Sequence, residues 1–262
     1  MAPIMTVTTD FRDVYPAIMK GVIMNIAPGT NIIDITNTIE QGNILQGAFI
    51  LKSASAYFPP GTIHLAVVDP GVGSKRRALV IKGERYTFVG PDNGLMIPAA
   101  REQGEFKVFE ITDPEFYTDH VSPVFHGRDV FAPAAAFIAA GKEVPLSGEI
   151  LDYIEIDPGK EKVADRSIYG KVVYVDGFGN MITNITGETM SGIYDYGDKI
   201  KINGSPSKFV KAYHEGSEET AIALIGSHGM LEIAVNLGSA SKALSINAGD
   251  EISIEPIRGN TY

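Results

Sequence analysis

Two segments of this chain place residue types that can orient or activate a small polar molecule beside sharp turns. Asp69 follows an apolar, strand-like run and precedes a Pro-Gly turn, and Arg76 comes seven residues later. His126 stands just before an alanine-rich stretch that starts like a helix. A carboxylate at a strand end, a guanidinium on the next loop and a histidine at a helix entrance are the components of a polar site above a parallel sheet, where ligands bind in open α/β folds. Taken singly, the three residues are better explained as a turn former, a solvated charge and a helix-capping residue.

The elements that would position these residues alternate between strand-like and helix-like patterns as far as about residue 148. The patterns predict helices at 15–26, 42–58 and 130–140, and strands at 5–10, 31–36, 62–68, 78–82, 86–89 and 106–111. Such alternation is typical of βαβ units, in which the strands run parallel. We therefore predict the α/β fold class for residues 1–156, as an N-terminal catalytic domain with a largely parallel central sheet.

The second half of the chain has a different pattern. Short alternating or apolar runs separated by turn residues predict strands at 171–175, 181–185, 199–202, 208–213, 220–225, 231–235 and 251–254. This spacing favours an antiparallel barrel or sandwich. We predict a smaller C-terminal antiparallel β-barrel domain at residues 169–262, joined to the first by a polar linker at residues 157–168.

Composition excludes several classes of protein. The chain has 262 residues, a formal net charge of −10 and no cysteine. Without cysteine it forms no disulfide and uses no thiol chemistry, and we expect no metal site and a cytoplasmic location. The net negative charge argues against nucleic acid as a partner, because phosphate contacts need clustered lysine and arginine. No apolar run is long enough to span a membrane, and the first ten residues lack the features of an export signal, so we expect neither.

Longer motifs occur along the chain in one order. They are TTDF at 8–11, MKGVI at 19–23, IIDIT at 32–36, YFPPGTIHLAVVDPGVGS at 57–74, PDNGL at 91–95, FHGRDVFAPAAA at 125–136 and DGFGNMITNI at 176–185. Together they resemble the S-adenosyl-L-methionine (SAM) hydroxide adenosyltransferases, or SAM hydrolases, which are relatives of the SAM-dependent fluorinase and chlorinase. The resemblance covers nearly the whole chain. It implies an α/β domain followed by a small β-barrel, and a homotrimer in which SAM lies between one subunit's N-terminal domain and a neighbour's C-terminal domain.

The reaction that the resemblance implies is attack of water or hydroxide on the 5′ carbon of SAM, which releases adenosine and L-methionine. SAM is then the substrate, and no cofactor is expected. The leaving group is a neutral thioether and needs no acid, so the difficulty is to hold and activate a weak nucleophile. By resemblance, Asp69, Arg76 and His126 are the catalytic residues that activate the water. We hypothesise that Asp69 and Arg76 form an electrically neutral clamp that orients water, and that neutral His126 accepts its proton.

The resemblance also assigns substrate contacts to the first half of the chain. Asp10 would accept hydrogen bonds from the ribose hydroxyls, since a carboxylate can accept from both members of a diol. Phe125 would pack against the nucleoside. Two departures from the family pattern border this region: Arg12 directly precedes Asp13 in a shortened loop, and Gly42 or a near neighbour replaces an aromatic residue of the fluorinase.

The remaining substrate contacts would come from the second half of the chain. They are Asp176 for the α-ammonium, Phe178 for packing, Asn180 for polar contacts, Ser227 for the methionine carboxylate, and backbone groups near Val235 and Leu237 for adenine. Without the resemblance, the DGFGN segment is better explained as a glycine-rich hairpin turn, and Asp92-Asn93-Gly94 is equally well explained as a turn alone.

Two other functions compete with hydrolysis. The first is synthesis of an adenosyl halide from SAM. By resemblance, Asp69 occupies the position of a halogenase tyrosine, and Gly127 that of the serine that contacts halide in the fluorinase. Since a carboxylate repels a halide ion, hydrolysis is favoured. The second is a non-catalytic SAM- or adenosine-binding protein, against which the presence of all three predicted catalytic residues argues.

Overall fold

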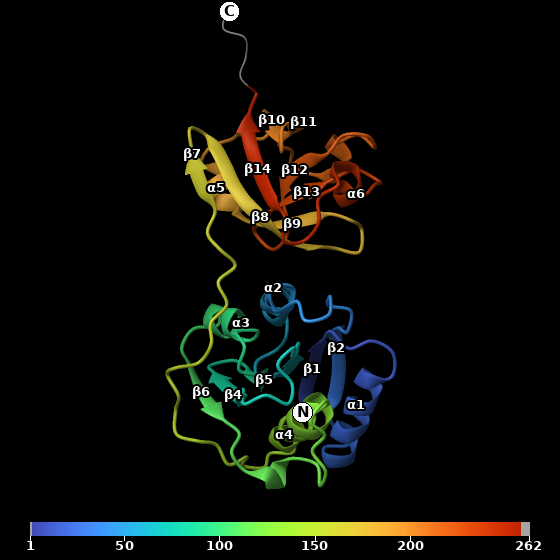
Figure 1. Ribbon diagram of the computed structural model, residues 1–262, viewed down its shortest axis with the longest axis vertical. Coiled ribbons are helices and arrows are strands. Elements are labelled where there is room, and N and C mark those ends of the chain that lie inside the picture. Colours follow the sequence, from blue (N-terminus) through green and yellow to red (C-terminus); the bar gives the residue numbers. More distant parts are fainter. Residues whose placement is uncertain (1, 258–262) are drawn as a thin grey trace, which may run out of the picture. The chain divides into compact units, whose positions relative to one another are not determined.

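The computed structural model describes residues 2–257, which form two separate sheets (Figure 1). Clustering of backbone contacts divides the chain into one unit within Met1–Ile156 and a second within Asp157–Tyr262. None of the helices in the described residues has the length and apolarity needed to cross a membrane.

The first unit contains a six-stranded sheet with helices on both faces. Its strands are β1 (Ile4–Thr9), β2 (Asn31–Thr36), β3 (Ile63–Val67), β4 (Ala78–Gly83), β5 (Thr87–Pro91) and β6 (Phe106–Glu110). The order is β2-β1-β3-β5-β4-β6, in which β2, β1, β3 and β5 pair in parallel and β4 is antiparallel to both of its neighbours. The predicted largely parallel sheet is confirmed.

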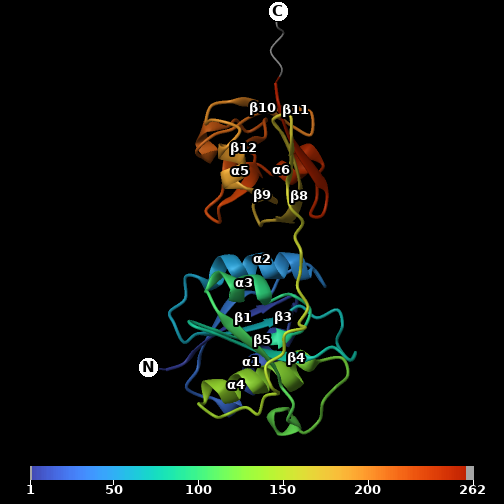
Figure 2. The same cartoon turned by 90° about the vertical axis from the view of Figure 1, so that its left-hand side faces the viewer.

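The helices of this unit are α1 (Tyr15–Ile26), α2 (Ile44–Ser55), α3 (Ile97–Glu102) and α4 (Ala132–Ala139). Helices α1 and α4 cover one face of the sheet, and α2 and α3 cover the other (Figure 2). Alternate residues of β3 accordingly belong to two cores: Leu65 and Val67 pack with α1 and α4, whereas Ala66 packs with α2 and α3. This alternation is the two-residue period of a strand buried on both faces.

The two strands that follow β1 in the chain lie on opposite sides of β1 within the sheet. From β1 it runs through α1 to β2 on one side, and from β2 through α2 to β3 on the other side of β1. The carboxyl ends of β1 and β3 are therefore the topological switch point, where open α/β sheets bind ligands. Asp10 directly follows β1, and Asp69 follows β3 by two residues.

The second unit is an antiparallel, nearly closed barrel, which confirms the predicted architecture. Its strands are β7 (Lys162–Ala164), β8 (Ser167–Val175), β9 (Met181–Thr186), β10 (Lys199–Ile202), β11 (Ser205–Lys208), β12 (Ile222–Ile225), β13 (Met230–Ala234) and β14 (Glu251–Pro256), with the short helices α5 (Gly187–Ser191) and α6 (Ala240–Leu244). The order is β11-β10-β14-β8-β9-β13-β12, and β7 pairs with β8 outside this path. A bridge between Phe209 and Ala223 brings the two edges of the sheet together.

Three segments differ from the sequence-based expectation. The second half of the expected linker, 157–168, holds β7 and the start of β8, which are joined by Asp165 and Arg166 at φ of 47° and 64°. Both residues are in the left-handed region that a two-residue hairpin turn requires, and the absence of glycine there concealed the turn. The strand expected at 208–213 ends at Lys208, where its ladder with β10 stops. The helix expected at 130–140 is α-helical only at Ala132–Ala139, and its first two residues belong to a π-helical turn, Gly127–Phe131.

Candidate active site

Asp69 and His126 lie on two loops that approach each other closely at Gly73. This glycine has φ of 77°, and a Cβ added to it would lie 2.4 Å from the carbonyl oxygen of Pro123. Only glycine fits this contact without moving the backbone. The close approach brings the loop after β3 against the segment that leads into the π-helical turn, a type of irregularity that is frequent at functional sites.

Arg76 joins the other two predicted catalytic residues. Its Nε donates to both carboxylate oxygens of Asp69 at 3.0 Å, and its Nη2 donates to Asp69 Oδ2 at 2.6 Å. The same Nη2 lies 2.7 Å from Nδ1 of His126. The side chains of Asp69 and Arg76 are only 3% and 10% exposed. The structure therefore brings these three residues together as a partly buried, hydrogen-bonded cluster with an internal ion pair.

The contact with Arg76 fixes the protonation pattern of His126. A guanidinium group has donors only, so Arg76 donates and Nδ1 of His126 accepts. Burial, followed by the charge of Arg76, lowers the pKa of His126 below its ordinary value, although Asp69 and Asp129 act in the opposite direction. The ring is then neutral near pH 7 and carries its proton on Nε2. In this arrangement His126 offers a donor, and its accepting nitrogen is already occupied, which differs from the proton-accepting role that we hypothesised.

Asp10 lies at the same edge of the sheet with one oxygen available. Its Oδ2 accepts a hydrogen bond from the backbone N–H of Gly42 at 2.8 Å, whereas its Oδ1 is buried without a partner among the described residues. Burial raises the pKa of Asp10, and the nearby carboxylate of Asp69 acts in the same direction, while the Gly42 hydrogen bond lowers it. A buried, unpartnered carboxylate oxygen is a strong acceptor that a ligand hydroxyl can satisfy.

Phe125 belongs to an aromatic cluster beside this carboxylate. Its ring makes edge-to-face contacts with Phe11 and Tyr15 at centroid distances of 5.6 and 5.4 Å. Phe11 also fills the space in front of Gly127, where an added Cβ would lie 2.7 Å from the ring. A serine at position 127 therefore does not fit unless Phe11 moves.

The shortened loop at Arg12 and Asp13 lines a groove of about 560 Å³ next to Phe11. Asp13 has φ of 59°, so the loop turns sharply at this residue. Asn37 also lines this groove, and its Oδ1 accepts a hydrogen bond from the Thr9 hydroxyl. Sequence reasoning did not select Asn37 or the backbone of Gly42, although a polar residue directly after a parallel strand, as Asn37 is after β2, is a usable signal.

In the second unit, Asp176, Phe178 and Asn180 share the tight turn between β8 and β9. The Oδ1 atom of Asp176 accepts from the backbone N–H groups of Phe178 and Asn180, both at 2.9 Å. Asp176 Oδ2 accepts from Nδ2 of Asn180 at 3.1 Å. The Phe178 side chain, by contrast, is 82% exposed. The turn thus satisfies its own polar groups and presents a large apolar ring.

Val235 and Leu237 lie at the same end of the barrel as this turn. They follow β13, whose Ile233 pairs with Met181 at the start of β9, directly after the turn. Leu237 is 87% exposed, and Val235 is buried. Ser227 is an exposed residue of the turn between β12 and β13, beyond the opposite end of β13. The structure therefore groups five of the six predicted residues of this unit, and Ser227 lies in the turn whose His228 contacts Glu232 of β13.

Glu232 is a buried carboxylate that sequence reasoning missed. Its Oε1 accepts a hydrogen bond from the Tyr213 hydroxyl at 2.6 Å, and its Oε2 lies 3.5 Å from Nε2 of His228. Burial, then Glu232, then Asp176 raise the pKa of Tyr213. The signal in the sequence was a single charged residue inside an apolar strand. Within residues 2–257, no group of three or more His, Cys, Asp or Glu side chains is arranged to hold a metal ion.

Comparison with known proteins assigns both units. Residues 5–148 match the family model of the SAM hydroxide adenosyltransferase N-terminal domain, and residues 170–253 match that of the C-terminal domain. The chain is 40% identical to a protein of Methanocaldococcus jannaschii named (R)-S-adenosyl-L-methionine hydrolase, over 96% of this chain and 95% of that protein. It is 27% identical to a fluorinase of Nocardia brasiliensis, over 90% of each chain. The crystal structure of an uncharacterized conserved protein from Thermotoga maritima superimposes with a TM-score of 0.87 at 36% identity, covering 96% of this chain and 99% of the other.

Proposed function

The chain belongs to the SAM hydroxide adenosyltransferase family, and we propose that it is an enzyme that hydrolyses SAM by attack of water on the 5′ carbon, giving adenosine and L-methionine. The observation that carries this proposal is the partly buried Asp69–Arg76–His126 cluster beside the topological switch point of the sheet. Relatives that are 30 to 40% identical over most of the chain bear the name of this activity.

The ion pair suits a cationic substrate. An unpaired guanidinium about 5 Å from the sulfonium centre of SAM would repel it by roughly 3 kcal/mol at an effective dielectric constant near 20. The two-point contact between Arg76 and Asp69 cancels most of this repulsion. Arg76 can then orient its neighbours without opposing the binding of SAM.

We assign the water to the Asp69 carboxylate. There it donates one hydrogen bond to Asp69 and keeps a lone pair for attack. The Nε2–H of His126 lies on the side of the ring away from Arg76, where it can donate to another acceptor at the site. As the bond from oxygen to the 5′ carbon forms, the bond from carbon to sulfur breaks and its electron pair stays on the methionine sulfur. The attacking oxygen becomes positively charged and strongly acidic, so even a carboxylate paired with arginine accepts its proton. Asp69 is therefore the proposed proton acceptor, Arg76 orients its carboxylate, and His126 holds the Arg76 guanidinium in place.

The other predicted residues bind the two ends of the substrate in this proposal. The unpartnered Oδ1 of Asp10 accepts from the ribose hydroxyls, and Phe125 packs against the nucleoside. In the second unit, Asp176 and Asn180 contact the amino-acid end and the exposed Phe178 packs against the substrate. The remaining assignments are Ser227 for the methionine carboxylate and the backbone near Val235 and Leu237 for adenine.

We further propose a cytoplasmic homotrimer with each site between two subunits. Supporting this, each unit holds part of the predicted site, and two large apolar side chains of the barrel face solvent. The absence of cysteine suits a reducing compartment. An Asp69→Asn variant and an Asp176→Ala variant, assayed at a SAM concentration too low for either to turn over alone, should recover part of the activity when they are mixed, dissociated and reassembled. No recovery in mixed assemblies would contradict shared sites.

The relatives' name specifies the (R) configuration at sulfur, and we propose the same configuration for this substrate. The two sulfur epimers exchange the positions of the methyl group and the methionine chain, so a site that holds both the nucleoside and the amino acid discriminates between them. Separate incubation with each purified epimer tests this: faster release of adenosine from the (S) epimer would refute it.

The decisive experiment is incubation of the purified protein with SAM in water enriched in oxygen-18, followed by mass spectrometry. Hydrolysis at the 5′ carbon places the label in the adenosine 5′-hydroxyl and none in methionine. A 5′-halogenated nucleoside in the presence of halide would instead establish halide synthesis. SAM that is bound but unchanged after long incubation would establish a non-catalytic binding protein.

A further inference from the structure

The turn after β5, residues 91–94, has no part in the proposed chemistry but contacts the loop that carries it. Asn93 Nδ2 donates a hydrogen bond of 2.7 Å to the carbonyl oxygen of Val68. Val68 directly precedes Asp69. The Asn93 side chain is itself held in place, since its Oδ1 accepts from the backbone N–H of Leu95. One end of the catalytic loop is therefore fixed by this turn.

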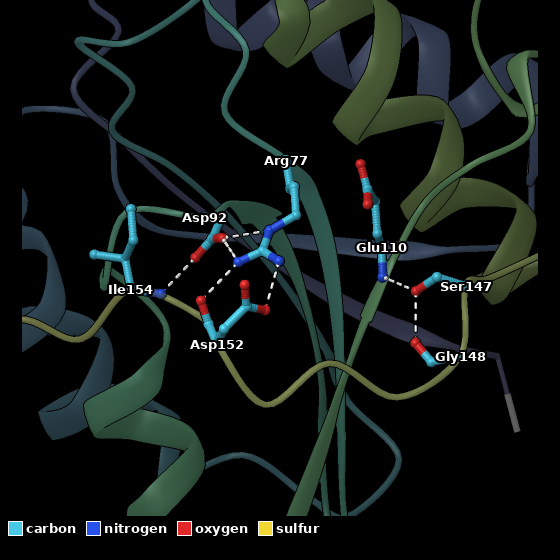
Figure 3. Close-up of polar contacts among 7 residues, drawn as sticks. All are labelled: Arg77, Asp92, Glu110, Ser147, Gly148, Asp152 and Ile154. Carbon is cyan, nitrogen blue, oxygen red and sulfur yellow. Dashed lines mark hydrogen bonds and ion pairs between the residues drawn. The ribbon is translucent and has the colours of Figure 1, made fainter.

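The neighbouring residue of the same turn fixes the other end of the loop. The backbone N–H of Asp92 donates to the carbonyl oxygen of Arg77 at 3.1 Å. The Asp92 carboxylate accepts from Arg77 Nε at 2.8 Å and lies 2.7 Å from its Nη2 (Figure 3). Arg77 directly follows Arg76. Two adjacent side chains thus hold the residue before Asp69 and the residue after Arg76.

The pair of Asp92 and Arg77 is rigid. The Asp92 side chain is only 4% exposed, and its second oxygen accepts from the backbone N–H of Ile154 at 2.8 Å. Arg77 is anchored further by the carbonyl oxygen of Asp152 (Figure 3). A buried charge that is paired and fully hydrogen-bonded resists displacement, because a change in its position leaves a charge unpaired. The segment around Asp152 and Ile154 covers the turn and closes this network.

We propose that Asp92 and Asn93 are positioning residues for the Asp69–Arg76–His126 cluster. By fixing both ends of the loop from 69 to 76, they hold the Arg76 guanidinium between Asp69 and His126. The reason for such a device is geometric: a displacement of about 1 Å in a catalytic group can reduce a rate about 100-fold. The proposal rests on the proposed function, and the tests below separate the two.

The first test compares steady-state kinetics of three variants. Asp92→Asn removes the charge that holds Arg77, and Asn93→Ala removes the hydrogen bond to Val68. Each should lower kcat about 10- to 100-fold and change KM by less than about threefold, because neither residue contacts the substrate. The matched control is Asp152→Asn, the same chemical change at the other carboxylate bound to Arg77, whose side chain is 81% exposed. It should retain kcat within about twofold, since an exposed pair contributes little.

The second test measures the tautomer of His126 in the cluster and requires no catalytic reaction. Nitrogen-15 NMR of the histidine rings, with His126 assigned by a His126→Gln variant, reports which ring nitrogen carries the proton. The wild-type protein should show the Nε2–H form near pH 7. In Asp92→Asn and Asn93→Ala, the Nδ1–H form should increase, because a displaced Arg76 no longer donates to Nδ1.

The outcomes separate the alternatives. Folded variants that keep both the wild-type kcat and the wild-type His126 tautomer would overturn the proposal and leave the turn with a structural role only. A variant that raises KM as much as it lowers kcat/KM would show an effect on binding instead, and would also overturn it. If the wild-type protein leaves SAM unchanged, the proposed function fails, while the NMR measurement still decides whether Asp92 and Asn93 hold Arg76 against His126.

Discussion

The predicted site residues of the two units differ in how far they are buried and in what they bond to. At the sheet edge of the first unit, the side chains of Asp69 and Arg76 are largely buried and paired with each other. At the turn of the barrel, Phe178 and Leu237 are largely exposed, and Asp176 bonds mainly to its own turn. The first arrangement is preorganised for charge development, whereas the second leaves large apolar side chains exposed to solvent. We therefore expect changes in the first unit to alter kcat and changes in the barrel turn to alter KM.

The largest effect should come from Asp69→Asn. This change removes the proposed proton acceptor and leaves the Arg76 charge uncompensated beside a cationic substrate, so kcat should fall about 10³-fold. Stopped assays of adenosine release at saturating SAM measure it. The control is Glu102→Gln on α3, which alters an exposed ion pair with Lys52 of α2 and should leave kcat unchanged. If Asp69→Asn released adenosine at the wild-type rate, the expectation that changes in the first unit alter kcat would be wrong.

A second prediction concerns the stability of the first unit at acidic pH. His64 is fully buried in the first unit, where the Thr6 hydroxyl lies 2.7 Å from its Nδ1 and Phe88 stacks on its ring. Burial lowers its pKa from 6.5 to about 4. Because the unfolded chain binds this proton first as pH falls, the stability present above pH 6.5 is lost between about pH 6.5 and 4, by roughly 3 kcal/mol in total.

The measurement is the free energy of unfolding in urea at several pH values between 7.5 and 4. Acidification should lower the free energy of unfolding of His64→Gln less than that of the wild type, by roughly 3 kcal/mol. Hydrogen exchange should place the extra acid sensitivity of the wild type in the first unit and not in the barrel. Equal pH dependence of the two proteins would show that His64 is not responsible.

Phe178→Ala tests the barrel turn directly. If the exposed ring becomes buried against substrate, its removal should cost about 1.5–3 kcal/mol of binding and raise KM by one to two orders of magnitude, with little change in kcat. Thermal stability should be unchanged. Phe209→Ala is the matched contrast: this ring is 1% exposed, so its loss should destabilise the barrel by about 3–5 kcal/mol. A Phe178→Ala variant with normal KM would mean that the turn does not contact the substrate.

The smallest effect concerns pH and the tautomer of His126. Since burial and Arg76 lower its pKa, the ring should stay neutral at mildly acidic pH, and kcat should begin to fall only below the ordinary value of 6.5. Protonation of Nδ1 then abolishes the hydrogen bond from Arg76. A profile of kcat against pH measures this decrease at acidic pH. His126→Asn has no group that titrates at this position and should not show the decrease. A midpoint above 6.5 would argue against the close contact with Arg76.

Local patterns predicted most of the elements of the first unit. The helix at 15–26 and the strand at 31–36 have the predicted bounds, because Met19 and Ile23 recur at helical spacing and the strand lies between turn signals. The short helices α3, α5 and α6 and the strand β7 were not predicted. Elements of three to six residues carry too few apolar positions to show a period, and β7 depends on a turn without glycine.

The sequence by itself determined the family, the two-part architecture and the identity of the residues that carry charge at the site, because these follow from motif order and hydrophobic period. Only the tertiary structure decided what those residues do to one another. Arg76 and His126 are fifty positions apart, and the contact between Nη2 and Nδ1 assigns the histidine a donor role. The hydrogen bonds of Asn93 to Val68 and of Gly42 to Asp10 likewise join distant segments. The direction of a hydrogen bond depends on where two groups lie in space, and no local pattern along the chain records it.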